Sequence, residues 1–415
     1  ASWKNTLFLT VTGRNDWTST LPIENRSYFY PSVSGSFVLS QLLQDLGAID
    51  DSVLSFAKIR ASWAQVGKDT GAYETATELW GVANMNGITA VGNSWTRGNP
   101  YLKPEITRST EIGLEMSFFK NRLHFDYAYY TNNSFNQILS PRGPQSTGYI
   151  FCSINAGNVY NKGMELSISG TPIENRNFSW DMSLNLAGNR GTLDGLPTGT
   201  DVMYVTDVQY AGMQAASFNN GNFMAIAGTQ WTRVTPVVGS NANAALYGKV
   251  VLDKNGFPQY TTTLNEVGNR ESTFTGGFNN SISWKGLSFN MLWEFRVGGD
   301  VVNGTQYAMD LAGTSKFSGD IRKQPLTVSG VQQVGSHDET IGGETVSVPD
   351  YKEVSTTWKP DEVYEFNGKK MLGYNIIKNY YNSYYPYESA NYITKVNLIR
   401  LRSISLSYSL PKKWM

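Results

Sequence analysis

Residue types that support metal or redox chemistry are almost missing from this sequence of 415 residues. Cys152 is the only cysteine, which excludes an internal disulfide framework and a thiolate metal site. The two histidines, His124 and His337, are too few and too far apart in the chain for a histidine metal cluster. No serine nucleophile elbow is present either. We therefore expect no metal, no cofactor and no catalytic residues.

Charge and long apolar runs are also scarce. Charged residues make up 16% of the chain, and 34 acidic residues balance 34 basic ones. A neutral chain gives no electrostatic reason to expect a nucleic-acid partner. No run reaches the ~18 apolar residues of a membrane-spanning helix. Aromatic residues (13%) and 40 glycines are plentiful instead. This composition suits a transmembrane β-barrel, in which half of each strand faces water.

Two alternating runs within residues 99–131 show the pattern most clearly. Apolar side chains recur at every second position from Ile112 to Phe118, and again from Leu123 to Tyr129. Alternate side chains of a strand lie on opposite faces, so each run predicts an amphipathic strand of about ten residues. A tilted strand of that length crosses a bilayer, and the aromatic residues at its end resemble an interfacial girdle.

The same alternation recurs along the whole chain and predicts about ten strands. Besides the central pair, these are 3–13, 33–40, 54–66, 162–170, 178–188, 273–284, 287–297 and 393–410. An apolar phase slip between Phe56 and Ile59 suggests a bulge. Short and long connections alternate, as in a transmembrane barrel, although a soluble all-β repeat fold is the alternative. The long connections, predicted as extracellular loops, are 67–108, 132–161, 189–272 and 298–392.

The acidic residues on the predicted strands from the central pair to 287–297 avoid the apolar phase, and so does Arg296. A cationic side chain facing lipid at mid-bilayer would cost ~2–4 kcal/mol, which explains this sorting. The residues predicted to face a water-filled interior are Glu111, Glu115, Asp126, Glu165, Asp181, Glu294 and Arg296. Glu111 and Glu115 could also be interpreted as an acid–base pair. We prefer interior polarity, because acidic residues are common in a wet barrel.

Several short segments occur in an order that points to one family. They are 14–17, 30–36, 54–63, 99–105, 155–158, 161–165, 170–173 and 401–414. Together they resemble the C-terminal part of the barrel of a SusC/RagA-type TonB-linked outer-membrane transporter of Bacteroidetes. The resemblance covers nearly the whole chain. It implies a 22-stranded barrel plugged by an N-terminal domain with a TonB box, of which residues 1–415 would be a partial barrel domain without the plug and the last strands. The alternative is a ten-stranded barrel that closes by itself.

The resemblance also implies a function in the Gram-negative outer membrane. Such transporters import oligomers, here glycan in preference to peptide, with energy from TonB, ExbB and ExbD. A SusD-like lipoprotein would cover the long loops as a lid. One alternative is a structural barrel that serves as a scaffold without energy coupling. The other is a barrel enzyme, for which the sequence offers no catalytic site.

Aromatic residues in the long loops are candidates for ligand and partner contacts. Trp80, Trp95 and Trp231 could stack on sugar rings. A run of tyrosines could meet the partner protein: Tyr380, Tyr381, Tyr384, Tyr385 and Tyr387. The alternative for both groups is packing of the loops themselves. Residues 253–256 predict an Asn-Gly hairpin turn and not a calcium loop, because the later carboxylates are missing.

Overall fold

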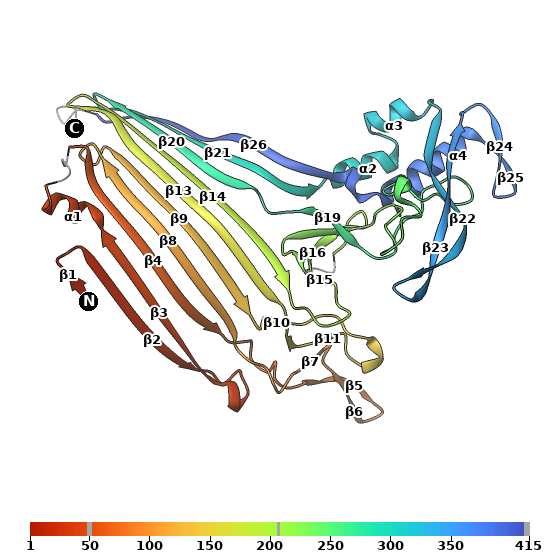
Figure 1. The fold of residues 1–415 in the computed structure, drawn as a ribbon, viewed down its shortest axis with the longest axis horizontal. Coiled ribbons are helices and arrows are strands. Elements are labelled where there is room, and N and C mark those ends of the chain that lie inside the picture. The colour runs from red at the N-terminus through yellow and green to blue at the C-terminus, as the bar shows by residue number, and fades with distance from the viewer. Residues whose placement is uncertain (48–51, 206–207, 411–415) are drawn as a thin grey trace.

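A computed structural model describes residues 1–47, 52–205 and 208–410 of the chain. It shows one long antiparallel sheet with irregular structure gathered at one end (Figure 1). The last residues of the segment 401–414 lie outside the described residues. We call the end with the long connections the loop end.

The main sheet has 12 strands within the described residues. Ten of them are long, which confirms the number predicted from the sequence. They are β2 (Leu7–Trp17), β3 (Ser27–Val38), β4 (Leu54–Lys68), β8 (Glu105–Phe118), β9 (Leu123–Phe135), β13 (Asn158–Asn175), β14 (Phe178–Asp194), β20 (Phe274–Trp284), β21 (Leu287–Val302) and β26 (Ile393–Tyr408). Two short strands, β1 (Ser2–Trp3) and β17 (Gly221–Asn222), complete the sheet.

Neighbours in the sheet follow chain order, from β1 at one edge to β26 at the other. Among the described residues, no pairing joins these two edges. The sheet of the described residues is therefore an open segment of barrel wall, and these residues do not show the ten-stranded closed barrel. The 22-stranded barrel stays a prediction.

Two details of the predicted strands were wrong. The first strand does not run from residue 3, because Lys4 and Asn5 have positive φ and turn the chain between β1 and β2. The bulge in β4 lies between Leu54 and Phe56, ahead of the predicted position. There the pairing with β8 skips Ser55, so the later apolar positions stay in phase.

One face of the sheet is apolar across its whole width. The strand register places seven apolar residues in one row: Leu7, Phe37, Ile59, Leu114, Tyr127, Leu166 and Leu186. Residues on this face are exposed in the isolated chain, with Ile112 at 56% and Ile404 at 59%. A water-soluble protein rarely leaves so large an apolar surface open, whereas lipid covers it in a membrane.

Two polar groups on the apolar face, those of Trp180 and Asn280, form a hydrogen bond with each other. Asn280 lies among Met182 and Met291 in the register and is buried. Its side-chain oxygen accepts a hydrogen bond of 2.6 Å from the indole nitrogen of Trp180. Each group thus satisfies the other, because neither could find water in a bilayer.

The connections alternate in length along the sheet, as predicted. At one end, tight turns join β8 to β9, β13 to β14 and β20 to β21, and helix α1 (Leu39–Asp45) lies between β3 and β4. Lys285 and Gly286 both have positive φ, which matches the turn required by a two-residue hairpin. At the loop end, the long connections are 69–104, 136–157, 195–273 and 303–392. These connections are shorter than the predicted loops, because the strands extend beyond the last residue of each alternating apolar run.

These loops contain strands and helices of their own. The strands are β5 (Leu79–Met85), β6 (Ile88–Asn93), β7 (Thr96–Arg97), β10 (Ile138–Leu139), β11 (Phe151–Cys152), β12 (Ile154–Asn155), β15 (Val202–Tyr204), β16 (Gln214–Phe218), β18 (Ala225–Gly228), β19 (Asn265–Asn269), β22 (Leu326–Ile341), β23 (Glu344–Trp358), β24 (Val363–Phe366) and β25 (Lys369–Leu372). The helices are α2 (Gly304–Ala312), α3 (Lys316–Ile321) and α4 (Gly373–Ser383), with 3-10 turns η2 (Gln145–Thr147), η3 (Ala244–Leu246), η4 (Tyr385–Tyr387) and η5 (Ser389–Tyr392). A further 3-10 turn, η1 (Ile23–Asn25), lies between β2 and β3. None of the described helices has the length and hydropathy needed to span a bilayer.

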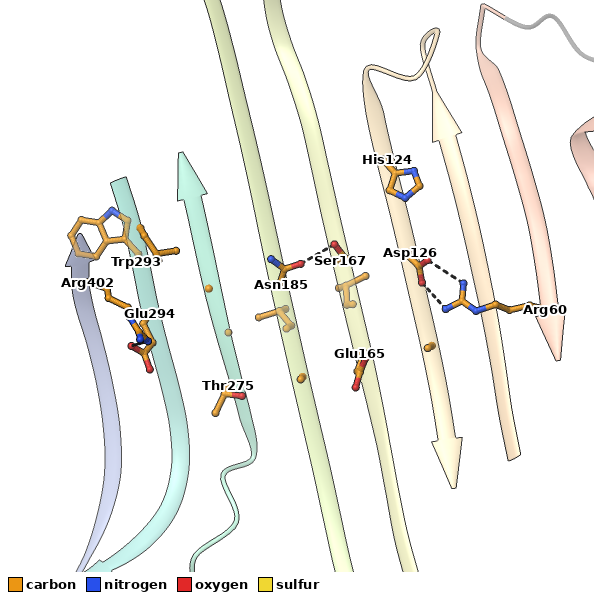
Figure 2. Close-up of a pocket in the computed structure, with 17 residues that line it drawn as sticks. Arg60, His124, Asp126, Glu165, Ser167, Asn185, Thr275, Trp293, Glu294 and Arg402 are labelled. Atoms are coloured by element: carbon orange, nitrogen blue, oxygen red, sulfur yellow. Dashed lines mark hydrogen bonds and ion pairs between the residues drawn. The ribbon is translucent and has the colours of Figure 1, made fainter. Parts of the chain in front are cut away.

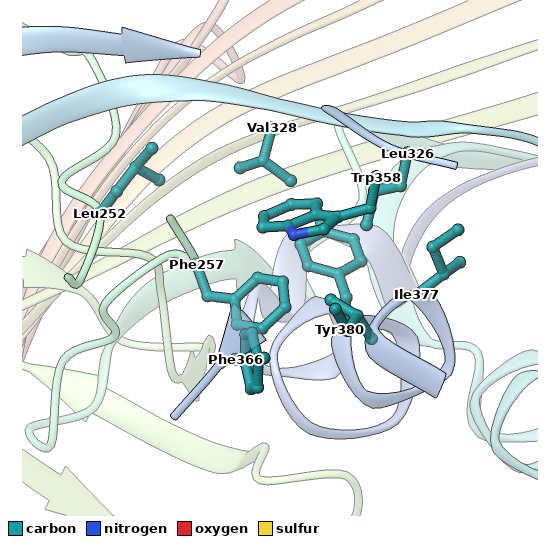
Figure 3. Packing of buried hydrophobic residues seen from close by; sticks show 9 residues of the cluster. Leu252, Phe257, Leu326, Val328, Trp358, Phe366, Ile377 and Tyr380 are labelled. Atoms are coloured by element: carbon teal, nitrogen blue, oxygen red, sulfur yellow. The ribbon is translucent and has the colours of Figure 1, made fainter. Parts of the chain in front are cut away.

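The two longest loops share one hydrophobic core. Leu252 and Phe257 come from connection 195–273, and the other members come from 303–392: Leu326, Val328, Trp358, Phe366, Ile376, Ile377 and Tyr380. Phe257 lies at the centre of this cluster, which we call the loop core (Figure 3). Its ring centroid is 4.9 Å from that of Trp358 and 5.3 Å from that of Phe366. The two loops therefore form one folded unit.

The predicted hairpin turn at 253–256 is confirmed and presents Phe257 to that core. The side chain of Asp253 accepts hydrogen bonds from the backbone nitrogens of Asn255 (2.8 Å) and Phe257 (2.9 Å). Gly256 has a φ of +83°, which a glycine adopts without strain. The carboxylate of Asp253 thus fixes the turn.

Candidate functional site

The face of the sheet opposite the apolar one is polar and holds a hollow of about 700 Å³. Seven strands contribute charged or hydrogen-bonding side chains to it, with Arg60 at one side and Arg402 at the other (Figure 2). Between them, the Ser167 hydroxyl donates a 2.8 Å hydrogen bond to the side-chain oxygen of Asn185. The hollow is thus a hydrophilic surface, suited to water and to polar solutes.

Arg60 joins three strands on this face. Its Nη1 and Nη2 donate to both carboxylate oxygens of Asp126 at 3.0 and 2.9 Å, and its Nε donates to Glu111 at 3.3 Å. The side chain must pass over β8 to reach β9, and Gly113 leaves the room. A Cβ on Gly113 would lie 2.4 Å from the Nε of Arg60. The two parallel hydrogen bonds between Arg60 and Asp126 fix the orientation of the guanidinium, in addition to the attraction between the opposite charges.

A second ionic group lies at the other side of the hollow. Glu294 on β21 accepts a 3.0 Å hydrogen bond from Arg402 and lies 4.0 Å from the guanidinium of Arg400. The pairing of β21 with β26 shifts between Leu292 and Trp293, which brings two arginines near one carboxylate. The polar face therefore carries fixed charges of both signs.

All seven residues predicted to face the interior share this polar face. The register pairs Glu115 with Asp126, and Glu111 lies four residues earlier on the same face of β8. It continues through β13, β14 and β20 to β21, so that Glu165, Asp181, Glu294 and Arg296 follow on the same side. That this side is the lumen of a closed barrel stays a prediction.

The sequence analysis missed the basic partners on this face. Lys58 pairs with Glu115 at 3.3 Å, and Arg60 and Arg402 make the contacts described above. Lys58 and Arg60 alternate with Ala57 and Ile59, so strict period two would have revealed them. The contact between Arg402 and Glu294 could not be predicted from the sequence in this way, because it depends on the shift in the pairing of β21 with β26.

A larger hollow of about 1520 Å³ lies at the loop end, and we call it the loop cavity. Its walls come from two of the long connections, 136–157 and 195–273. Aromatic lining residues are Phe151, Tyr204, Phe218 and Phe223. Its charged lining residues are Arg142, Arg270 and Asp201. Apolar rings combined with a few polar groups are typical of small-molecule sites. No residue of this cavity was singled out from the sequence.

Trp231 packs within the loops. Its indole nitrogen donates to the backbone oxygen of Tyr384 at 3.0 Å, and its backbone nitrogen donates to Glu388 at 2.7 Å. Its ring also packs beside that of Tyr380. These contacts favour the packing alternative for Trp231, while its role in ligand binding is untested.

The tyrosine run is divided between packing and surface. Tyr380 is 6% exposed in the loop core, and burial raises the pKa of its hydroxyl, which therefore stays protonated. Tyr381, Tyr384 and Tyr385 are half-buried against the same core. Tyr387 is more exposed and stacks on Tyr260 with ring centroids 3.9 Å apart. A contact between these tyrosines and a partner protein stays a prediction.

Trp80 and Trp95 lie on a different part of the loop end. Trp80 is 54% exposed on the β5–β6 hairpin, and Trp95 is 64% exposed just after it. The indole nitrogen of Trp80 donates to the backbone oxygen of Asn93, which fixes the ring without covering it. Both rings are open to a ligand or a partner, so their predicted role is sterically possible.

The comparisons with known proteins agree with this geometry. The family model described as "TonB dependent receptor-like, beta-barrel" matches residues 1–281. The chain belongs to the TonB-dependent receptor β-barrel family. Members of this family are receptors and transporters, and their barrels lie in the bacterial outer membrane. The two-faced sheet of this TonB-dependent receptor is the corresponding barrel wall.

Relatives named as TonB-dependent receptors cover the chain to different extents. Receptor P3 of Formosa agariphila is 26% identical over 71% of this chain, and receptor P39 of the same organism is 25% identical over 98%. The receptor SusC of Bacteroides thetaiotaomicron is 27% identical over 64%. The chain spans only about a third of these relatives, since it covers 31% of P3, 39% of P39 and 26% of SusC.

Solved structures show the same fold. The RagAB peptide importer in its closed-closed state matches 99% of this chain and 40% of the matched RagAB chain, with a TM-score of 0.67 and 19% identity. Another structure of the RagAB peptide transporter matches 74% of this chain and 33% of its own, with a TM-score of 0.60 and 22% identity. The alignment over 99% of the chain includes the loops and the strands beyond residue 281.

Proposed function

We propose that this chain is part of an active importer that takes up a nutrient oligomer across the outer membrane. The observation that carries the proposal is the family match over the two-faced sheet, together with the charged polar face of that sheet. A wall that is apolar outside and charged inside suits passage of a hydrophilic solute. Energy would come from TonB, ExbB and ExbD through a part of the protein outside this chain.

We favour a glycan oligomer over a peptide as the substrate. The loop cavity combines aromatic rings with the amides of Gln209, Gln214 and Asn265. Rings that stack on sugar faces and amides that bind hydroxyl groups form a suitable site for a saccharide. RagAB is named as a peptide transporter and shares the fold, so a peptide is the main competing substrate.

A SusD-like surface lipoprotein would bind at the loop end. The β5–β6 hairpin and the residues just after it leave several large apolar side chains exposed: Leu79, Trp80, Ile88, Val91 and Trp95. Aromatic residues of this kind are enriched where proteins bind one another. This surface supports a protein partner as a lid over the cavity.

The proposal is tested by uptake in cells. A strain that carries the full-length transporter is supplied with a fluorescent oligosaccharide, with and without the tonB gene. We expect uptake to fall at least tenfold without TonB, and a lipoprotein to co-purify with the transporter. Undiminished uptake in cells that lack TonB would favour the scaffold alternative instead.

A further inference from the structure

Arg270 has an unsatisfied guanidinium group at the boundary between the sheet and the loops. It follows β19 and precedes β20. Its Nε is buried, and among the described residues no group accepts a hydrogen bond from it. Its Nη2 contacts the sulfur of Met224 at 3.7 Å, and sulfur is a weak acceptor. A buried donor without a partner is destabilising, and more so when it is charged.

The carboxylates nearby in sequence or structure do not neutralise it. Asp300 accepts a 2.8 Å hydrogen bond from the backbone nitrogen of Asn269. Glu271 accepts hydrogen bonds of 3.1 and 2.9 Å from the backbone nitrogen of Gly191. Both acids therefore use neutral donors although Arg270 is adjacent to Asn269 and Glu271 in sequence. In the described part of the chain, Arg270 makes no ion pair within 4.0 Å.

A second arginine increases the positive charge at this point. Arg296 donates from Nη2 to the backbone oxygen of Arg270 at 3.0 Å and from Nε to that of Gly298 at 3.2 Å. Both acceptors are neutral carbonyl groups. Arg270 and Arg296 both line one hollow of about 390 Å³, so two positively charged residues lie at this part of the wall and attract an anion.

This charge faces the loop cavity. Arg270 lines the cavity of about 1520 Å³ and also a neighbouring hollow of about 390 Å³, as does Gln214. The hollow also includes Arg296 and Asp300. Arg270 is therefore placed where a solute in the cavity can reach it. Phe218 and Phe223 supply rings in the same cavity, beside the hydroxyl of Thr263.

We propose that Arg270 binds a carboxylate group of an acidic oligosaccharide in the loop cavity. The planar guanidinium offers paired N–H groups that match the two oxygens of a carboxylate, and such a pair is among the stronger hydrogen-bonded contacts in proteins. The rings and amides of the cavity bind the rest of the sugar chain. This inference rests on the proposed import function and assigns its substrate class: a glycan that contains uronic acid.

The test measures binding of two matched probes to the full-length transporter in detergent. The probes are a uronic acid tetrasaccharide and its methyl ester, which has the same rings without the charges. Arg270→Gln and Arg270→Lys are compared with Arg322→Gln, which removes an exposed loop arginine that does not line the cavity. Resistance of the barrel to unfolding in detergent, seen as its mobility on an unheated gel, verifies that each variant is folded.

We expect the acid to bind at least tenfold more tightly than the ester. Arg270→Gln should abolish this preference, Arg270→Lys should retain part of it, and Arg322→Gln should change it less than twofold. Equal binding of acid and ester, or an unchanged preference in Arg270→Gln, would overturn the inference. Tighter binding of a tetrapeptide with a free carboxylate would overturn the assignment to sugars.

Uptake of the same probes separates this inference from the proposed function. TonB-dependent uptake of the ester at the same rate as the acid would overturn the role of Arg270 and leave import intact. Uptake of neither probe, nor of neutral glycans or peptides, would overturn import itself.

Discussion

At the scale of single residues, a missing side chain determines how charge is arranged on the polar face. Gly113 is the pairing neighbour of Arg60, and its lack of a Cβ lets that arginine extend over β8 to Asp126. The backbone of Gly113 is ordinary strand, since its φ is not positive. Space, and not backbone freedom, is therefore the reason for a glycine at this position.

Gly113→Ala should destabilise the barrel by about 1–2 kcal/mol. The new Cβ would lie 2.4 Å from the Nε of Arg60, so the arginine must leave Asp126, and a partly exposed ion pair contributes modestly. Urea unfolding of the full-length protein measures the change. Gly277→Ala is the matched control on the same face, because its nearest neighbour would be 3.7 Å away. Equal stability of the two variants would refute this role of Gly113.

The roles of some residues could be predicted from the sequence, and the roles of others could not. The acids of the polar face could be predicted, because alternation fixes the face of each strand residue. Arg270 could not, because it lies between strands and its contacts come from Met224 and Arg296, which are distant in sequence. Trp231 was singled out as an aromatic loop residue, yet its contacts with Tyr384 and Glu388 depend on chain segments about 150 residues away.

At the scale of elements, the loop core makes two connections behave as one unit. Phe257 is 0% exposed and packs against rings from β23, β24 and α4. The sequence did not predict β22 and β23, because their apolar alternation is brief and a register shift between Gln333 and Gly335 interrupts it. Non-local packing stabilises this hairpin where its own pattern is weak.

Phe257→Ala should destabilise the loop core by about 3–5 kcal/mol, the usual cost of removing a buried aromatic ring. The barrel wall lies outside the loop core and should stay folded. Limited proteolysis of the full-length protein checks this: we expect faster cleavage within both 195–273 and 303–392. Val238→Ala is the control, because Val238 is 90% exposed. Cleavage confined to the first of these loops would show that they fold separately.

At the scale of the whole molecule, the sheet separates two solvents. Its apolar rows continue across strand after strand, and its charged rows continue on the other side. This much followed from period two in the sequence, because a bilayer demands it of every strand. Whether the barrel closes could not be predicted, since closure depends on strands that pair with β2 and β26 at the edges.

Leu114→Arg should reduce the stability of the membrane-inserted barrel by about 2–4 kcal/mol, because it places a cation against lipid. Ser167→Arg places the same side chain in the polar hollow and should cost less than about 1 kcal/mol. Unfolding in urea from lipid vesicles compares the two variants. An equal loss of stability in the two variants would contradict the assignment of the apolar face to lipid and the polar face to water.

The shared loop core also limits how such proteins diversify. Its two halves are separated in the gene by the segment that encodes β20 and β21, so one recombination breakpoint in that hairpin would join Phe257 to an unrelated Trp358 or Phe366. Such a chimera would combine the loop-core residues of one parent from 195–273 with those of the other parent from 303–392. Exchange of binding specificity between paralogues therefore requires both breakpoints to fall outside residues 195–392, so that the two loops are inherited together as one cassette.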